Sequence, residues 1–237
     1  MRIYDELKSR LFNEGASLIG FADLTNVSLA DEFNYQSGIS IAVALSAEIL
    51  SGIKDSPTKE YVKEYERVNS KLDELSYIGE SILTEAGYKA KAIPATTHSY
   101  DHVDFRAPFQ HKTTAILAGL GWIGKLAVLV TEQYGSGLRL ATVLTDIPPK
   151  KEDIKPLIDS KCGACILCAD ACPADASKRL NWIFGMKREE LVDINSCNIS
   201  MTKRTKELGL TRSICGICLV SCPWTRRYIN ANIDSGR

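Results

Sequence analysis

The first 161 residues of the chain contain no cysteine, and histidine, methionine and tryptophan each occur only three times in 237 residues. No apolar run approaches the about 20 residues of a transmembrane helix, and residues 1–10 lack the apolar core of a secretory signal peptide. Lysine plus arginine equals aspartate plus glutamate at 29 each, so no overall positive field attracts nucleic acid or an anionic membrane. These absences predict a cytoplasmic protein outside the membrane, with at most local contacts to nucleic acid.

The rest of the composition is that of an ordinary globular protein. Apolar residues make up 45% of the chain and charged residues 24%, which is enough to build a sizeable core. The length suits one or two domains. Pro148 and Pro149, followed by the charged stretch 150–155, mark a change in composition. We therefore expect one domain of residues 1–155 and a second of residues 156–237.

All eight cysteines fall in the last third of the chain. The first run has the spacing C-x2-C-x2-C-x3-C and is followed by Pro173. This is the bacterial ferredoxin pattern, in which three thiolates bind one 4Fe-4S cluster and the fourth reaches a second cluster. A later C-x2-C-x3-C run and one isolated cysteine complete the eight thiolates that two such clusters need: Cys162, Cys165, Cys168, Cys172, Cys197, Cys215, Cys218 and Cys222.

Crosswise sharing between the runs is the hypothesis for the ligand sets. One cluster takes Cys162, Cys165, Cys168 and Cys222, and the other takes Cys172, Cys197, Cys215 and Cys218. A disulfide framework is one alternative, but nothing in the chain indicates an oxidising compartment. Zinc is another, since C-x2-C pairs also bind it in tetrahedral sites. Zinc sites join two such pairs, however, whereas a four-cysteine run ending in Cys-Pro suits a cubane cluster.

Apolar spacing predicts a mixed α/β arrangement before the cysteines. A four-residue repeat from Ile3 to Leu11 predicts an amphipathic helix. A longer helix is expected to begin with Ser56 as N-cap and Pro57 at its first position, and to end before Gly87. Short apolar runs predict strands at residues 17–22, 39–45, 89–93, 127–131 and 138–144.

Residues 119–124 read GLGWIG, which satisfies the G-x-G-x-x-G pattern of dinucleotide-binding loops. The surrounding sequence argues against that use. Residues 125–131 reach the turn-rich stretch 134–137 too soon for a crossover helix. Glu132 and Asp146 also miss the acidic position expected about 20 residues further on.

Several segments together resemble epoxyqueuosine reductase: residues 118–125 (AGLGWIGK), 132–136 (EQYGS), 145–148 (TDIP), both cysteine runs and 222–226 (CPWTR). The resemblance covers residues 89–228 well and the amino-terminal third weakly. That family reduces an epoxide in making the tRNA base queuosine, uses cobalamin and two 4Fe-4S clusters, and is related to reductive dehalogenases.

The resemblance implies an α+β chain, with a nitroreductase-like α/β domain that holds a corrinoid, followed by a ferredoxin-like domain with two 4Fe-4S clusters. Electrons would pass from the outer cluster to the inner cluster and then to cobalt. The family's corrinoid site carries over to Gly119, Gly121, Trp122, Gly124, Lys125, Tyr134, Gly135 and Ser136. Glycines allow the backbone to approach a flat ring closely, although they also serve tight turns.

The family's proton donor is an aspartate that precedes the glycine segment and lies near a proline. Pro108 aligns with that proline, which puts Phe105 at the expected position and Asp104 one residue earlier. Asp104 is therefore the candidate donor, because a buried acid beside a reduced cofactor can protonate a leaving oxygen. A solvated loop carboxylate is the alternative.

Three histidines, His98, His102 and His111, fall within fourteen residues. Histidine ligates metals and titrates near neutral pH. Their spacing matches no recognised ligand set, so we expect them to be exposed or hydrogen-bonded, with a role for His98 and His102 at a corrinoid as the alternative.

Family members usually extend beyond the second cysteine run into a helical-repeat domain that grips tRNA, whereas this chain stops at Arg237. Together with zero net charge, this makes tRNA an unexpected partner. The leading expectation is an iron-sulfur oxidoreductase whose clusters pass electrons from an external donor, such as ferredoxin or flavodoxin, to a corrinoid that reduces a small substrate. The alternatives are a ferredoxin-like carrier, or reductive partner, without its own substrate, and a minimal epoxyqueuosine reductase.

Overall fold

The computed structural model of the chain describes residues 2–27, 31–95, 105–149 and 156–234. The chain divides into two compact units, each assembled from three separate stretches. The first unit comprises Met1–Ala44, Val68–Leu120 and Arg139–Leu157, and the second comprises Leu45–Arg67, Gly121–Leu138 and Ile158–Arg237. The sequence suggested a single boundary near residue 155, whereas these units interleave along the chain.

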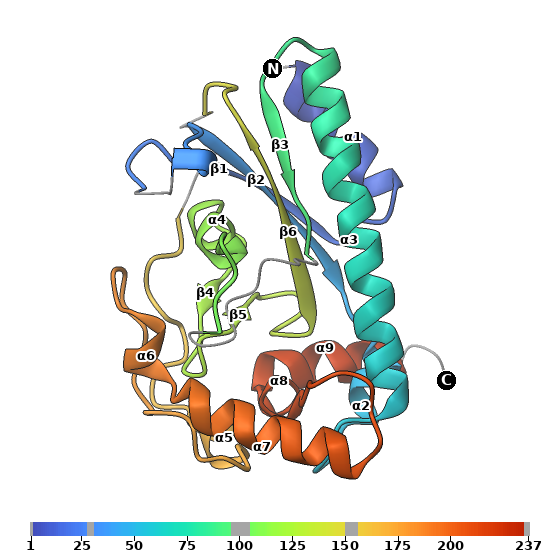
Figure 1. Cartoon of the computed structure of the whole chain (residues 1–237), viewed down its shortest axis with the longest axis vertical. Helices are drawn as coiled ribbons and strands as arrows, with labels where there is room; N and C mark the ends of the chain where they lie inside the picture. The colour runs from blue at the N-terminus through green and yellow to red at the C-terminus, as the bar shows by residue number, and fades with distance from the viewer. Residues whose placement is uncertain (1, 28–30, 96–104, 150–155, 235–237) are drawn as a thin grey trace. The chain divides into compact units, whose positions relative to one another are not determined.

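A four-stranded sheet with the strand order β1-β2-β6-β3 forms the centre of the first unit (Figure 1). Its strands are β1 (Leu18–Asp23), β2 (Ser37–Ala44), β3 (Ala90–Ile93) and β6 (Leu138–Thr145). The pairs β1–β2 and β3–β6 are antiparallel. In each of the two central strands, β2 and β6, seven of eight residues are buried. Burial on both faces explains why these strands read as short, nearly continuous apolar runs.

Helices cover both faces of this sheet (Figure 1). On one face lie α1 (Arg2–Asn13) and α3 (Lys59–Glu85), and on the other lies α4 (His111–Leu117). Successive side chains of a strand point to opposite faces. The Phe21 ring of β1 accordingly meets the Tyr4 ring of α1 at 4.7 Å. The neighbouring Gly20 faces α4, where an added Cβ would lie 2.8 Å from the Cβ of Ala118. Glycine at this position therefore allows α4 to pack closely on the sheet.

The start of α3 differs from the prediction. The helix begins at Lys59, and the hydroxyl of Thr58 accepts a hydrogen bond from the Tyr61 N–H at 3.1 Å, so Ser56 and Pro57 lie outside it. Its end agrees with the prediction, since Gly87 takes a left-handed φ of +89° two residues after the helix. The helix predicted at 3–11 and the strands predicted at 17–22, 39–45, 89–93 and 138–144 are confirmed within a few residues.

The second unit consists mainly of short helices and one hairpin. Its elements are α2 (Ala47–Ser51), β4 (Trp122–Ile123), β5 (Leu129–Val130), α5 (Leu167–Asp170), α6 (Arg188–Leu191), α7 (Ile194–Glu207), α8 (Ile217–Ser221) and α9 (Pro223–Asp234). Helix α9 packs against α2 and α8, and α5 packs against α8. The strand predicted at 127–131 is shorter than expected, because Ala127 takes a φ of +55° and only Leu129–Val130 pair with β4.

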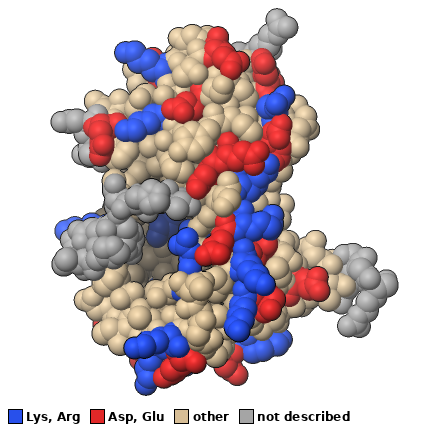
Figure 2. Space-filling model, turned by 45° about the vertical axis from the view of Figure 1, so that its right-hand side comes forward, with Lys and Arg blue, Asp and Glu red and all other residues tan. Residues whose placement is uncertain are grey.

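Charged residues of both signs lie on the surface. On the face shown in Figure 2, Lys and Arg side chains are interspersed with Asp and Glu. Along the chain the charges are uneven, since residues 158–237 hold twelve Lys and Arg against eight Asp and Glu. Within the described ranges, no helix has both the length and the apolarity needed to cross a membrane.

Candidate metal centre

The two cysteine runs adopt the same local structure. Each begins with a Cys-Gly pair whose glycine has a left-handed backbone, with φ of +54° at Gly163 and +79° at Gly216. Glycine takes this conformation without a steric cost. Each turn leads into a short helix, α5 or α8, and these two helices pack against each other. The runs therefore form a structural repeat whose halves are in contact.

Four thiols form a first group. Burial raises the pKa of the Cys168 thiol to about 11, and the neighbouring thiols of Cys222, Cys162 and Cys165 add to the rise. Cys222 also interacts with Cys162. The first group thus joins three cysteines around α5 to the last cysteine of the second run.

The other four thiols form a second group. Burial raises the pKa of the Cys218 thiol, and the thiols of Cys215, Cys197, Cys168 and Cys172 raise it further, in that order. Cys197, which lies on α7, interacts with Cys172 and Cys215. Cys172 of the first run thus interacts with cysteines beyond that run, and crosswise sharing of the ligands stays a prediction.

The donor atoms suit an iron-sulfur cage. Each group offers four sulfur donors, the number and type that a 4Fe-4S cluster takes, and all eight cysteines are free and half-buried. Across residues 2–27, 31–95, 105–149 and 156–234, no three His, Cys, Asp or Glu side chains are placed to hold a metal ion. A 4Fe-4S cluster differs from a single metal ion because each thiolate binds a different iron of the cluster. The type of donor atom and the grouping of the thiols therefore fit two 4Fe-4S clusters.

Polar groups near the thiols of Cys222 and Cys215 oppose the effect of burial on the pKa of each. Cys222 directly precedes α9, so the free N–H groups at the start of that helix face it. Burial raises the pKa of the Cys222 thiol, while the N–H groups of Thr225 and Trp224 and the Thr225 hydroxyl oppose that rise. The Ile217 N–H likewise opposes the effect of burial on the pKa of Cys215. Donors of this kind favour the thiolate, which is the form that binds iron.

The β4–β5 hairpin lies beside the first group of thiols. A Cβ added to Gly124 would lie 3.8 Å from the Cys162 sulfur. Lys125 is only 3% exposed, and its ammonium donates a hydrogen bond of 3.0 Å to the Arg179 carbonyl. The structure therefore brings part of the predicted corrinoid segment next to a predicted cluster ligand.

The loop of residues 134–136 is held against α9. The Ser136 N–H donates to the Thr225 hydroxyl oxygen at 2.9 Å, and the rings of Tyr134 and Tyr228 meet edge to face at 5.1 Å. Gly135, with φ of +55°, approaches Thr225 so closely that an added Cβ would overlap its backbone nitrogen. Gly121 approaches the Val130 carbonyl in the same way. Both glycines are therefore packed closely against the protein's own backbone.

The residues assigned to a corrinoid are mostly buried in the protein. Seven of the eight lie in the second unit, and Gly119 lies in the first. Of the seven, Tyr134 is half-buried and the others are buried. Two buried polar atoms, Trp122 Nε1 and Ser136 Oγ, have no hydrogen-bond partner within the part of the chain that the structure describes. An unpaired buried polar group costs free energy. A polar group of a bound molecule would remove that cost by pairing with these two atoms, and this is the feature of the segment that fits such a molecule.

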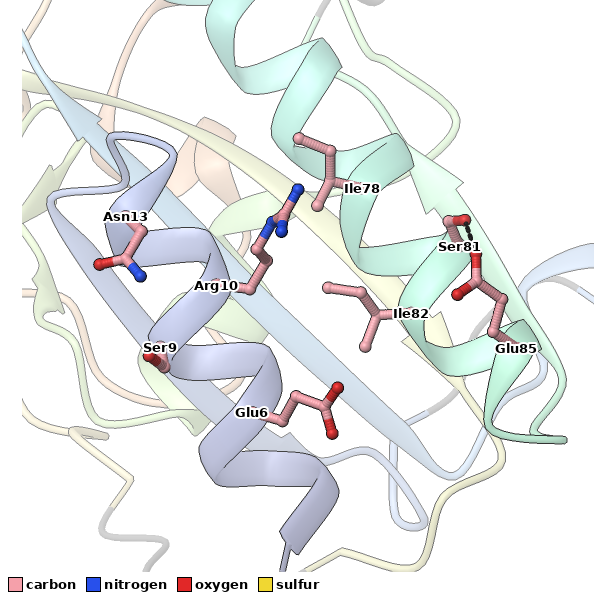
Figure 3. A pocket seen from close by; sticks show the side chains of 8 residues that line it. All are labelled: Glu6, Ser9, Arg10, Asn13, Ile78, Ser81, Ile82 and Glu85. Atoms are coloured by element: carbon pink, nitrogen blue, oxygen red, sulfur yellow. Dashed lines mark hydrogen bonds between the residues drawn. The ribbon is translucent and has the colours of Figure 1, made fainter.

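A groove of about 530 Å³ lies in the first unit, between α1 and α3 (Figure 3). Its lining residues are Glu6, Ser9, Arg10, Asn13, Ile78, Ser81, Ile82 and Glu85. Within it, the Ser81 hydroxyl donates to the Glu85 carboxylate at 2.7 Å. The groove contains none of the residues predicted to bind a cofactor.

The candidate proton donor Asp104 and two of the histidines, His98 and His102, lie outside the described residues. His111 begins α4, and its Nδ1 lies 2.9 Å from the Thr142 hydroxyl. Burial lowers the pKa of His111 to about 4, with a further contribution from the positive charge of Arg139. This histidine is therefore hydrogen-bonded, as expected, and neutral near pH 7.

The chain matches no protein-family profile. It is 33% identical over 129 residues to the epoxyqueuosine reductase of Cyclobacterium marinum, a match that spans 51% of this chain and 38% of that protein. It is 26% identical over 187 residues to the Aliivibrio fischeri epoxyqueuosine reductase, spanning 76% of this chain and 46% of that protein. The resemblance to epoxyqueuosine reductase is confirmed. The chain spans about two fifths of the length of the curated epoxyqueuosine reductases it matches at 32–33% identity.

Solved structures share the mixed α/β fold. A reductive dehalogenase studied for B12-dependent dehalogenation superposes with a TM-score of 0.70 at 17% identity, covering 97% of this chain and 34% of that chain. Epoxyqueuosine reductase bound to an epoxyqueuosine-modified tRNA-Tyr stem loop superposes with a TM-score of 0.60 at 19% identity, covering 95% of this chain and 66% of that chain. At these identities the likeness concerns the fold alone.

One residue of the metal centre was missed by the sequence analysis. The Thr225 hydroxyl opposes the rise in the pKa of the Cys222 thiol, and it accepts a hydrogen bond from the loop of residues 134–136. The signal that could have revealed it is the spacing Cys-x-x-Thr at the start of a helix, because a side chain at the N-cap meets the residue three positions later.

Proposed function

We propose that the chain is a reductase of the epoxyqueuosine reductase type, which passes electrons through two 4Fe-4S clusters. The observation that carries the proposal is the gathering of eight thiols into two groups of four, in a chain similar to enzymes of that name. The sequence alone favoured an unspecified small substrate. The relatives favour the epoxide of a modified tRNA base, which was the alternative.

The cysteines would hold the clusters by crosswise sharing. The first cluster would be bound by Cys162, Cys165, Cys168 and Cys222, and the second by Cys172, Cys197, Cys215 and Cys218. When bound, the clusters supply one-electron transfer. Residues 158–237 would then form the ferredoxin-like part of the protein, and the sheet of the first unit would belong to a nitroreductase-like part. An external protein such as ferredoxin or flavodoxin would donate the electrons.

A corrinoid is the third cofactor in this proposal. Three observations support it: the unpaired Trp122 and Ser136 polar atoms, the position of the hairpin beside Cys162, and the fold shared with a dehalogenase studied for B12-dependent dehalogenation. The hairpin and the loop of residues 134–136 would hold the corrinoid by polar contacts and exclude water from it. Asp104 is the proposed proton donor to the oxygen of the opening epoxide.

The tRNA stem loop that carries the modified base is the proposed substrate. The expectation that tRNA is not a partner has no support, because curated relatives are named epoxyqueuosine reductase and a structural neighbour is bound to a tRNA stem loop.

The test is turnover of a defined RNA. The chain is purified without oxygen, reconstituted with iron and sulfide, and incubated with an epoxyqueuosine-modified tRNA stem loop, cobalamin and a chemical reductant. We expect about eight irons per chain from two cubane clusters, and conversion of the modified base to queuosine by nucleoside analysis. A Cys218→Ser variant, which retains the first set of ligands, should lose conversion.

The other outcomes separate the remaining hypotheses. A chain that binds no iron contradicts the proposal. Eight irons with reversible reduction, but without corrinoid binding or base conversion, would identify an electron carrier. Eight irons and corrinoid binding without base conversion would return the substrate to the class of small organic molecules.

A further inference from the structure

Two charged side chains are buried among the residues that the structure describes, and only one of them has an ion-pair partner. Glu64, which is 4% exposed, pairs with the Arg67 guanidinium at 2.7 Å. Lys125 is 3% exposed, and its ammonium donates to a neutral group, the Arg179 carbonyl, at 3.0 Å. No Asp or Glu within the described ranges forms an ion pair with it. Lys125 is therefore a buried cation without a counter-ion in the described part of the chain.

The segment that follows the first cysteine run encloses Lys125. The Ser177 hydroxyl donates to the Lys125 carbonyl at 3.3 Å and accepts from the Arg179 N–H at 3.1 Å. The carboxylates of this segment are already engaged, because the Arg179 guanidinium pairs with Asp175 at 3.0 Å and with Asp170 at 3.6 Å. The segment therefore covers the lysine without neutralising its charge.

The nearest predicted cluster ligand lies beside the backbone of this lysine. A Cβ added to Gly124, the preceding residue, would lie 3.8 Å from the Cys162 sulfur. Consecutive Cα atoms are about 3.8 Å apart, so the Lys125 Cα lies within roughly 9 Å of that sulfur. Taking an ammonium out of water costs free energy that a nearby negative charge offsets. Thiolates that bind a 4Fe-4S cluster supply negative charge at this position.

We propose that Lys125 is the counter-ion of the cluster that Cys162 would bind, and that its charge raises the reduction potential of that cluster. The inference rests on the proposed function, since it requires the cluster to be bound. Reduction adds one negative charge to a cluster, so the net charge around it helps to set the potential. A buried cation acts across such a distance because water and salt screen it little. Removing the charge should therefore make this cluster harder to reduce.

The test is a redox titration of the reconstituted full chain without added corrinoid, followed by electron paramagnetic resonance. Lys125→Gln keeps a hydrogen-bond donor for the Arg179 carbonyl but removes the charge. We expect the reduction equilibrium of the cluster that holds Cys162 to fall about tenfold, which for a one-electron couple is a shift of ~59 mV to more negative potential. The second cluster should shift less, and Lys125→Arg, which keeps the charge, should retain the potential of the unaltered chain. The Cys172→Ser chain, expected to hold the first cluster alone, identifies its signal.

A matched control is Lys161→Gln. Lys161 directly precedes Cys162 in the sequence. Its side chain is 44% exposed, however, and its ammonium pairs with the Glu132 carboxylate at 2.5 Å. Solvent and the carboxylate both offset this charge, so its removal should change the potential much less than the removal of the Lys125 charge. An equal shift in the two variants would overturn the inference, because burial would then not be the source of the effect.

The results distinguish this inference from the proposed function. An unchanged potential in a Lys125→Gln chain that carries both clusters overturns the role of Lys125 alone, and so does an equal shift of both clusters. If Lys125→Gln loses only the first cluster while Lys125→Arg keeps both, the charge is needed for binding and the inference stands. Loss of both clusters from Lys125→Gln, or of the first from Lys125→Arg, marks a role in folding and overturns it. Failure of the unaltered chain to bind iron overturns the proposed function, and with it this inference.

Discussion

The thiols of Cys168 and Cys218 interact with each other although they belong to different groups of four. Each lies on the short helix that follows a Cys-Gly turn, and the contact between α5 and α8 brings them together. If each group binds a cluster, this pair provides the direct path for an electron from one cluster to the other.

Exchanging single cysteines for serine tests the crosswise ligand sets. Cys222→Ser should remove the first cluster and Cys172→Ser the second, because each group takes one cysteine from the other run. We expect each variant to retain about four irons and to lose a different paramagnetic resonance signal. Cys197→Ser, in the second group, is the matched control and should reproduce the spectrum of Cys172→Ser. Loss of the same signal from Cys222→Ser and Cys172→Ser would refute crosswise sharing.

Gly135→Ala should lower the free energy of unfolding by about 3 kcal/mol. The added methyl group would overlap the Thr225 backbone, and the left-handed conformation adds strain of its own. Gly209→Ala is the control, because Gly209 has a similar φ of +62° but no atom within 4 Å of an added Cβ. It should cost only about 1 kcal/mol. Chemical denaturation under anaerobic conditions measures both, and equal losses would show that strain alone matters.

His111 should make the protein less stable as the pH falls from about 6.5 to about 4. In this window the unfolded chain binds a proton at His111 that the folded protein does not bind, so unfolding is favoured. The loss should be about 1–3 kcal/mol, reduced by partial exposure of the ring. His111→Gln should remove this part of the pH dependence. Denaturation curves at pH 7 and pH 4.5 measure it, and parallel losses in both proteins would exclude His111 as the cause.

Glu64 should contribute stability above pH 4.5, the ordinary pKa of a glutamate, and lose it as the pH falls. Burial raises the pKa of Glu64, but hydrogen bonds from Arg67 and the Ser46 N–H outweigh burial and lower it overall. The carboxylate is thus bound more tightly in the folded protein than in the unfolded chain. Glu64→Gln should cost about 1–2 kcal/mol at pH 7, and the difference from the unaltered protein should shrink towards pH 3.

Glu74→Gln is the control for this prediction. Glu74 forms a similar pair with Lys71 at 3.0 Å on the same helix, but its side chain is 55% exposed, whereas that of Glu64 is 4% exposed. An exposed pair is worth at most about 1 kcal/mol. Equal effects of the two substitutions in thermal or chemical denaturation would rule out burial as the source of the Glu64 contribution.

The sequence was most informative where structure depends on neighbours along the chain. The spacing from Ile3 to Leu11 predicted α1, because helix periodicity is local. The cysteine spacing marked the two runs as a repeat, and each run indeed folds as one turn and one short helix. The N-cap of α3 was misplaced by two residues because Ser56 and Thr58 are both good caps, and only tertiary contacts decide between them.

The remaining features depend on partners distant in sequence. Gly135 and Gly121 match a cofactor-binding pattern, yet each packs against backbone of the protein itself, at Thr225 and Val130. No local pattern specifies such contacts. The two units interleave for the same reason. The stretches that belong to one unit are those that pack together, and a change in composition along the chain does not reveal them.

The hydrogen bond from Tyr228 to the Leu45 carbonyl joins residues 183 positions apart. At a translation rate of about 5–20 residues per second, Leu45 is made roughly ten seconds or more before its partner. The stretch Leu45–Arg67 therefore cannot complete its packing in the second unit until α9 has been made. The last ligands of the two proposed clusters, Cys218 and Cys222, are likewise made after the other six, so neither cluster could take its full ligand set before the second cysteine run is made.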